Sequence, residues 1–372
     1  MPTTNIPQIL SHMLDPSKFS RKDQYTRITS YTLALGLPKH VTQIQLSKYL
    51  PFSQSSISRT LSTSAISTQM LTDSRIQYVS AFLDSLSLKP KYLILDETVM
   101  KRYGKKRIEK MARFYSSIEK RPVDGIQLIQ SLLWINSKLY FPLFSDMTNA
   151  PGTSIEQFIS MLDKVTFDNL ILLVDGGITC AKIYFKAIKK GYTFIGRVKT
   201  NMNVVLNGRR VSLNDLTDKF IGVYSVVAYV PEYKDWLKIV FDNRMETRMN
   251  EKDKKGRVIL CSNTTMSDFE ILKHYSKRTY IEVYFKFTKD ELGLRQFVYS
   301  AKSMLRHVEL VEMYFTIWMV SQFWRNVKDR LGLRDFVERM RIIYYVVLFR
   351  LIAHNHRFRR KLESFLSQTC II

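Results

Sequence analysis

The stretch from residue 275 to residue 289 combines charged side chains at helical spacing with an aromatic background. At about 100° per residue, its polar members fall within roughly 80° of one another on a helical wheel. They are Tyr275, Arg278, Glu282, Lys286 and Lys289. The other positions are mostly apolar, which predicts a largely buried helix whose polar stripe faces a polar partner. A metal-bound phosphate would suit a carboxylate flanked by cations, although a solvated surface stripe is the alternative.

Two aspartates directly follow short apolar runs elsewhere in the chain. These runs read as buried strands, so Asp96 and Asp175 are each expected at a strand end. A single aspartate in such a place usually caps a turn. Together with Glu282, the two would supply carboxylates for two Mg²⁺ ions, with Mn²⁺ as a substitute, which is the centre that phosphodiester cleavage requires. Glu97 adjoins Asp96, and because strand side chains alternate, at most one of the pair should face the ions.

The elements that must position these carboxylates follow the order of an α/β domain. The sequence predicts strands at 91–98, 125–136, 138–144, 169–175 and 192–198, and helices at 154–165 and 179–190. This order is typical of a ribonuclease-H-like core, a mixed sheet with flanking helices. We expect the catalytic core at 89–200 and 264–300, a β-rich insertion at 201–263, and helical regions at 1–88 and 301–372. A basic patch at 356–361 belongs to the last of these regions.

A second pattern, in residues 41–62, is typical of a helix-turn-helix. Two short helical segments flank a turn, Ser53 can cap the second helix, and Ile57 and Leu61 give that helix an inner face. The outward positions, expected to contact DNA in the major groove, are Gln54, Ser55, Ser58 and Arg59. The alternative is a Ser/Thr-rich loop after a core helix.

Composition narrows the class of partner. The 372-residue chain has 57 Lys and Arg against 33 Asp and Glu, a formal net charge of +24. Because the basic residues are spread along the chain, a polyanion, and nucleic acid in particular, is the expected partner; charge alone does not separate DNA from RNA.

Other classes of protein are disfavoured. The cysteines Cys180, Cys261 and Cys370 are far apart, which predicts neither a zinc site nor disulfides and fits a reducing cytoplasm. Neither a signal-peptide pattern nor a membrane-spanning segment is expected, because Glu309 and Glu312 interrupt the longest apolar run. The sequence also lacks a GxxxxGK[ST] loop, so no nucleotide cofactor is expected.

The spacing of Tyr275, Arg278, Glu282 and Lys289 resembles the signature of prokaryotic insertion-sequence DDE transposases. The resemblance extends over about 90–300 and includes the sequence Gly-Tyr-Thr-Phe-Ile-Gly-Arg-Val-Lys-Thr-Asn at 191–201. It implies a ribonuclease-H-like fold with a β-rich insertion and assigns Asp96, Asp175 and Glu282 as metal ligands. Many relatives have a second aspartate where this chain has Glu97, so a role for that acid is not implied.

The resemblance also implies how the residues would meet DNA. Tyr275, Arg278 and Lys289 would contact phosphates near the cleaved end, and Lys286, on the same stripe, is expected only to point toward DNA. In relatives that form hairpin ends, an insertion-domain tryptophan stacks on a flipped base, which makes Trp236 a candidate; an ordinary core position is the alternative.

The sequence therefore predicts a cytoplasmic, nucleoid-associated transposase that binds the terminal inverted repeats of an insertion sequence. It would cut double-stranded DNA at the element ends and join the 3′-hydroxyl to target DNA, as a homodimer in a synaptic complex. Two alternatives stay open: a non-catalytic DNA-binding protein derived from a transposase, and a DDE-type nuclease without strand transfer. The repeat sequence, the target preference and the use of a hairpin intermediate do not follow from the sequence.

Overall fold

The computed structural model describes most of the chain up to residue 325. The described residues are 6–36, 43–50, 52–63, 66–102, 108–116, 119–148, 150, 152–217, 222–243, 258–295 and 300–325. The chain divides into two compact units, one from residues 1–81 and 286–372 and the other from residues 82–285. Both boundaries fall inside helices, one between Ala81 and Phe82 and the other between Phe285 and Lys286. The basic patch predicted at 356–361 lies outside the described residues.

The first unit is helical where it is described. Its elements are α1 (Ile6–Met13), η1 (Pro16–Lys18), α2 (Lys22–Ala34), α3 (Gln43–Tyr49), α4 (Gln54–Ser62), most of α5 (Thr68–Ser85), the end of α10 (Thr279–Asp290) and α11 (Ala301–Arg325). The long helix α11 contacts α1, α2 and α4. It is buried almost all round, which explains its long apolar sequence.

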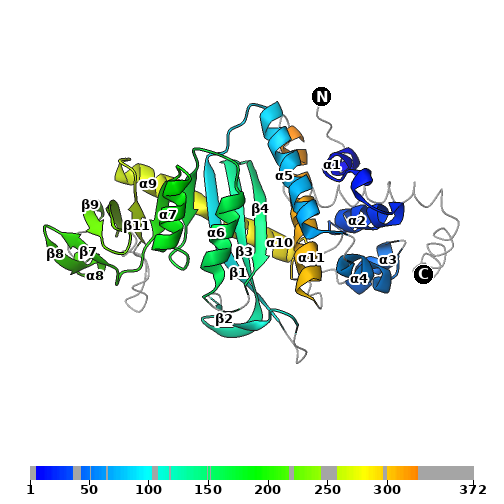
Figure 1. Cartoon of the computed structure of the whole chain (residues 1–372), viewed down its shortest axis with the longest axis horizontal. Helices are drawn as coiled ribbons and strands as arrows, with labels where there is room; N and C mark the ends of the chain where they lie inside the picture. The colour runs from blue at the N-terminus through cyan, green and yellow to red at the C-terminus, as the bar shows by residue number, and fades with distance from the viewer. Residues whose placement is uncertain are drawn as a thin grey trace, which may run out of the picture. The chain divides into compact units, whose positions relative to one another are not determined.

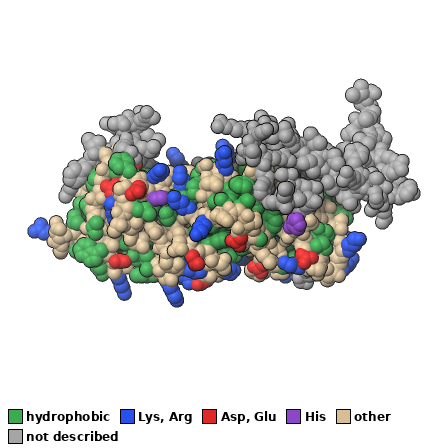
Figure 2. All heavy atoms as spheres, turned by 90° about the horizontal axis from the view of Figure 1, so that it is seen from above, with side chains coloured by type: hydrophobic (Ala, Val, Ile, Leu, Met, Phe, Trp, Pro, Cys, Tyr) green, Lys and Arg blue, Asp and Glu red, His purple; other side chains and the backbone are tan. Residues whose placement is uncertain are grey.

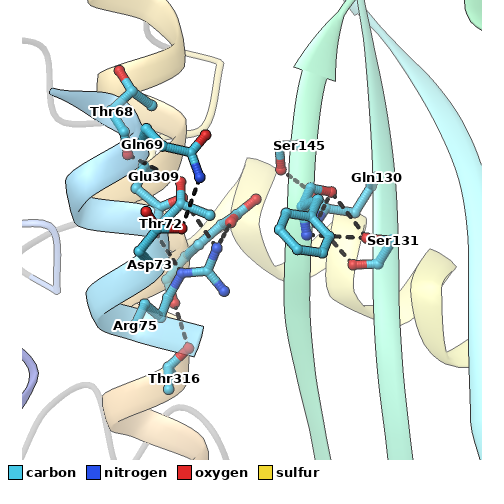
Figure 3. A network of polar contacts seen from close by, with 12 residues as sticks. Thr68, Gln69, Thr72, Asp73, Arg75, Gln130, Ser131, Ser145, Glu309 and Thr316 are labelled. Atoms are coloured by element: carbon cyan, nitrogen blue, oxygen red, sulfur yellow. Dashed lines mark hydrogen bonds and ion pairs between the residues drawn. The ribbon is translucent and has the colours of Figure 1, made fainter. Parts of the chain in front are cut away.

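Glu309 and Glu312, which interrupt that apolar sequence, are both buried. Figure 3 shows Glu309 beside Arg75 of α5. Arg75 Nε lies 2.5 Å from Glu309 Oε1, and its Nη2 lies 2.5 Å from Glu312 Oε2. Thr72 donates a further hydrogen bond of 2.7 Å to Glu309. The two acids therefore join α5 to α11 instead of facing solvent. Among the described residues, no helix is both long and apolar enough to cross a membrane.

The second unit is built on a mixed sheet (Figure 1). Its strands are β1 (Tyr92–Lys101), β2 (Ala112–Ser116), β3 (Arg121–Asn136), β4 (Leu139–Met147), β5 (Ile171–Val174), β6 (Thr193–Arg197), β7 (Asn203–Leu206), β8 (Arg209–Ser212), β9 (Val223–Val230), β10 (Asp235–Asp242) and β11 (Val258–Ser262). They lie in the order β2-β3-β1-β5-β6-β11-β10-β9-β7-β8, and β4 pairs with β3.

The centre of this sheet has the expected architecture. β1 pairs antiparallel with β3, and β3 with β4, whereas β1, β5 and β6 run parallel to one another. α6 (Ser154–Lys164) and α7 (Ala181–Lys189) cover one face, and α9 (Asp268–Tyr275) and the start of α10 cover the other (Figure 1). The prediction of a mixed sheet with flanking helices is confirmed, and the arrangement is consistent with a ribonuclease-H-like fold.

The strand that carries Asp96 is longer than predicted. Asp96 lies inside β1, opposite Gln130, and β1 continues to Lys101, opposite Gly125 of β3. A Cβ atom at Gly125 would lie 2.5 Å from the carbonyl oxygen of Met100, so only glycine allows the two strands to approach at this point. The expectation that the strand ends at Asp96 is therefore wrong, whereas Asp175 does directly follow β5.

Residues 203–262 hold β7 to β11 and the short helix α8 (Leu213–Thr217). β7 and β8 form a hairpin at Asn207 and Gly208, whose φ angles of 51° and 75° suit a type I′ turn. β11 pairs antiparallel with β6, so these strands extend the sheet that holds β1 and β5. The β-rich character predicted for this stretch is thus present as an extension of one sheet.

Candidate active site

The sheet places Asp96 and Asp175 next to each other. β1 and β5 are parallel neighbours, and Leu95 pairs with Val174. The next residue in each segment is an aspartate: Asp96 within β1 and Asp175 directly after β5. Glu282 lies in the first turn of α10, on the face of the sheet covered by α9 and α10. Three acids that are separated by 79 and 107 positions in the sequence thus lie around the same side chain, Arg278.

A single guanidinium group joins the three carboxylates. Arg278 Nη1 lies 2.7 Å from Asp96 Oδ2, and its Nε lies 3.9 Å from Asp175 Oδ1. Its Nη2 donates to Glu282 Oε1, one helical turn later. Tyr275 donates a hydrogen bond of 3.3 Å to Asp175 Oδ1. The structure therefore brings together five of the residues singled out in the sequence.

Burial and charge both act on this cluster. Burial raises the pKa of Asp96 to about 7, although Arg278 opposes the shift, and the charges of Asp175 and Glu282 add to it. For Arg278, burial disfavours the charged form, yet the neighbouring carboxylates, Asp96 first among them, hold its pKa above the usual value. Burial likewise raises the pKa of Tyr275, so this phenol stays protonated. Three carboxylates this close repel one another, and the positive charge of Arg278 offsets part of that repulsion.

Glu97 points away from this cluster. Burial raises the pKa of Glu97, and the Ser154 side chain, at the start of α6 on the opposite face of the sheet, opposes that shift. This geometry follows from strand alternation, as the sequence predicts for the Asp96–Glu97 pair. Only Asp96 of the pair contacts Arg278.

The chain does not form one helix from Tyr275 to Lys289, so that prediction is wrong. α9 ends at Tyr275, a 3₁₀ turn spans Ser276–Arg278, and α10 begins at Thr279. The hydroxyl of Ser276 donates to the carbonyl of Lys273, and that of Thr279 to the carbonyl of Ser276, three residues back in each case. Such bonds favour a tighter turn over a regular α-helix.

An aromatic cluster that the sequence did not indicate holds this turn on the sheet. The Tyr280 ring lies 5.8 Å from that of Trp134 and 5.3 Å from that of Tyr140, measured between centroids. The Tyr92 hydroxyl is 2.5 Å from Nδ1 of His274, near the end of α9. These side chains lie on three different strands and two helices, so only the strand pairing reveals that they meet.

The remaining candidates of the stripe differ in exposure. Lys286 is exposed on α10, one turn after Glu282. Lys289 is buried, with 8% of its surface exposed. Val283 is 54% exposed, so α10 is less buried than its aromatic composition predicts.

Trp236 is not a core residue, and that alternative is wrong. On β10 it is 61% exposed, and its ring centroid lies 5.9 Å from that of Tyr229, its cross-strand neighbour on β9. Val227, two residues before Tyr229, is 60% exposed. An exposed tryptophan next to a tyrosine leaves an aromatic face open to a partner.

The helix-turn-helix region has the local structure predicted for it. α3 and α4 flank a turn, and Ser53 caps α4 by accepting a 3.3 Å hydrogen bond from the amide of Ser56. Ile57 and Leu61 are buried. Gln54, Ser55 and Arg59 are exposed and Ser58 is half-buried. The loop alternative is therefore wrong for residues 54–62.

The donor chemistry at Arg278 fits a divalent metal, because carboxylate oxygens are the ligands that Mg²⁺ and Mn²⁺ prefer. As the side chains stand, no three His, Cys, Asp or Glu residues in the described part of the chain are grouped closely enough to hold an ion. The guanidinium of Arg278 lies among the carboxylates instead. The three carboxylates that could bind a metal are present, and they are spread around the guanidinium of Arg278.

A family model described as the transposase DDE domain matches residues 87–306, which is more than half of the chain. The chain belongs to the DDE transposase family. The match spans β1, β5 and α10, and so includes every residue of the Arg278 cluster. None of the curated proteins matches the chain.

Membership of this family establishes the class of reaction and of partner. DDE transposases are endonucleases that carry out DNA transposition and recombination, they act on DNA, and they generally use divalent metals. The surface agrees with a polyanionic partner: Figure 2 shows Lys and Arg side chains scattered over the described part of the visible face. The site lies just past Leu95 and Val174, where the parallel pairing of β1 with β5 ends; the carboxyl ends of parallel strands are the usual place for ligand binding in α/β sheets.

Proposed function

We propose that this DDE transposase binds the terminal inverted repeats of an insertion sequence, cuts the DNA at the element ends and joins the freed 3′-hydroxyl to target DNA. One observation supports this most strongly: Asp96, Asp175 and Glu282 meet around one guanidinium in a chain of this family. Both steps are in-line displacements at phosphorus, which need positioned charge more than covalent chemistry.

Asp96, Asp175 and Glu282 would hold two Mg²⁺ ions, with Mn²⁺ as a substitute. Bound there, the ions supply activation of the attacking oxygen and neutralise the leaving oxygen. The backbone amide of Glu97 donates a 2.8 Å hydrogen bond to Asp96 Oδ1, which fixes that carboxylate in its orientation. Tyr275 does the same for Asp175. The chain thus orients two of its three carboxylates with its own donors.

The polar residues between positions 275 and 289 would bind the DNA phosphates. Arg278 and Tyr275 lie at the carboxylates, and exposed Lys286 extends the positive charge along α10. Lys289 keeps the role that the transposase signature gives it only if DNA reaches a side chain that is 8% exposed. We therefore assign the phosphate near the cleaved end first to Tyr275, Arg278 and Lys286.

Helix α4 and Trp236, which lie apart from the Arg278 cluster in the sequence, fit the same function. α4 would enter the major groove of the terminal repeats, with the exposed side chains of Gln54, Ser55 and Arg59 and the half-buried Ser58 toward the bases and phosphates. Trp236 would stack on a base flipped out at the element end. A homodimer would hold the two ends together in a synaptic complex.

Cleavage of labelled end DNA by purified protein tests this proposal. Glu282→Gln keeps the shape of the side chain and removes one ligand charge, so strand cleavage in Mg²⁺ should fall by about a thousandfold or more, while end binding stays within about threefold. Glu156→Gln, a change at an exposed position of α6, is the matched control and should leave both cleavage and end binding unchanged. Full cleavage by the Glu282 variant would refute the proposed catalytic centre.

The same assay separates the two other functions. A nuclease without strand transfer would cut the ends but never join them to an added target duplex. A non-catalytic binder would shift the end DNA and leave it intact in Mg²⁺ and in Mn²⁺.

A further inference from the structure

Arg278 is arranged as a cation shared among three acids. Its three nitrogens each face a different carboxylate, those of Asp96, Asp175 and Glu282. The partners come from β1, from the end of β5 and from α10, so the guanidinium connects the sheet to the helix that lies on it. A planar guanidinium with five donors can do this, whereas a lysine ammonium cannot span the same positions.

The charges in the cluster do not balance. When all three carboxylates are ionised, they carry three negative charges against the single positive charge of Arg278, which leaves two negative charges. One divalent cation would balance these two remaining negative charges. Arg278 therefore stabilises the three acids in place without fully neutralising them, and the cluster keeps an attraction for a further cation.

The guanidinium is not sealed from solvent. Its side chain is 14% exposed and that of Glu282 is 54% exposed, so solvent reaches one side of the cluster. When Arg278 turns away, Asp96 keeps its hydrogen bond from the Glu97 amide and Asp175 keeps its hydrogen bond from Tyr275. The carboxylates would thus stay near their present places after the guanidinium has moved.

We propose that Arg278 is an internal counter-ion that holds the three carboxylates together and competes with the divalent cation for them. This rests on the proposed function, in which the same carboxylates are the metal ligands. Metal binding and release of the guanidinium are then one exchange, and the released guanidinium is available for a phosphate. Arg278 is a positioning residue in this exchange before it becomes a contact to DNA.

Mn²⁺ binding to the full-length protein, without DNA, tests the exchange by a readout that does not depend on activity. Free Mn²⁺ is followed by electron paramagnetic resonance in the wild type and in four variants. Arg278→Gln removes the competitor and should bind Mn²⁺ about tenfold more tightly, and Arg278→Lys about threefold more tightly. Lys277→Gln removes a neighbouring positive charge that contacts none of the three acids, so its affinity should stay within about twofold. Asp96→Asn should lose the binding.

The outcomes separate this inference from the function on which it rests. If binding depends on Asp96 but Arg278→Gln leaves it unchanged or weaker, Arg278 does not compete and only this inference fails. If wild-type binding does not depend on Asp96, the metal site itself is wrong and both proposals fail. Should Arg278→Gln not fold, Arg278→Lys, which keeps the charge, decides by the same criterion.

Discussion

Two arginines in this chain each gather carboxylates, one in the helical unit and one in the sheet unit. Arg75 lies between Glu309 and Glu312, and the side chains of these three residues are 0%, 4% and 0% exposed. Arg278 lies among Asp96, Asp175 and Glu282, whose side chains are 13%, 33% and 54% exposed. The same chemical groups are sealed from water in the first cluster, part of which Figure 3 shows, whereas water reaches the second cluster on the side of Asp175 and Glu282.

This difference in exposure determines how readily each arginine can exchange its partners. A buried ion pair is costly to break, because the partner left behind is an uncompensated charge in a medium of low polarity. A cluster that water reaches can replace one cation with another at much lower cost. We therefore read the Arg75 cluster as a fixed connection between α5 and α11 and the Arg278 cluster as a site for exchange.

The largest effect on stability is expected at Arg75. Arg75→Met leaves Glu309 and Glu312 buried without a cation, so the free energy of unfolding should fall by about 3–5 kcal/mol in urea denaturation. The matched control is a triple variant, Arg75→Met with Glu309→Leu and Glu312→Leu, which replaces the whole cluster with apolar side chains and should recover most of the loss. A single variant that costs less than about 1 kcal/mol would remove the contrast with Arg278.

A smaller effect, dependent on pH, is expected at His307 of the same helix. Burial lowers the pKa of His307 to about 4, with Tyr31 2.9 Å from Nδ1 and the Gly293 carbonyl 3.0 Å from Nε2. The folded state thus holds this imidazole neutral, whereas the unfolded chain protonates it near pH 6.5. The resulting stability is complete above that pH and is lost as the pH falls toward 4, by roughly 3 kcal/mol in total.

Urea denaturation between pH 7.5 and pH 4 checks this expectation. His307→Gln removes the titrating group and should flatten that part of the pH dependence, whatever it does to stability at pH 7. An unchanged slope in the variant would show that other groups cause the loss in acid.

Local features of the fold were predictable because they rest on neighbours in the sequence. Asn207-Gly208 favours a type I′ turn, Ser53 can reach an amide three residues later, and the run before Asp175 has the composition of a buried strand. Spacing also placed Arg278 and Glu282 on neighbouring turns, where the structure pairs them.

What could not be predicted depends on pairing between distant segments. The length of β1 beyond Asp96 is set by its register with β3 and by the space that Gly125 leaves. The burial of Glu309 depends on Arg75, 234 residues earlier in the chain. The helix break before Thr279 depends on hydroxyl groups that compete with backbone hydrogen bonds, which the apolar periodicity does not report.

Two adjacent acids on β1 provide the sharpest test of whether the Arg278 cluster is the catalytic centre. Asp96 contacts Arg278, whereas its neighbour Glu97 faces α6 on the other side of the sheet. Strand cleavage of labelled end DNA in Mg²⁺, measured beside end binding, compares Asp96→Asn with Glu97→Gln. We predict that Asp96→Asn loses cleavage by about a thousandfold with end binding intact, and that Glu97→Gln stays within about tenfold of the wild type. Cleavage that survives Asp96→Asn, or that both variants lose equally, would show that the Arg278 cluster is not the catalytic centre.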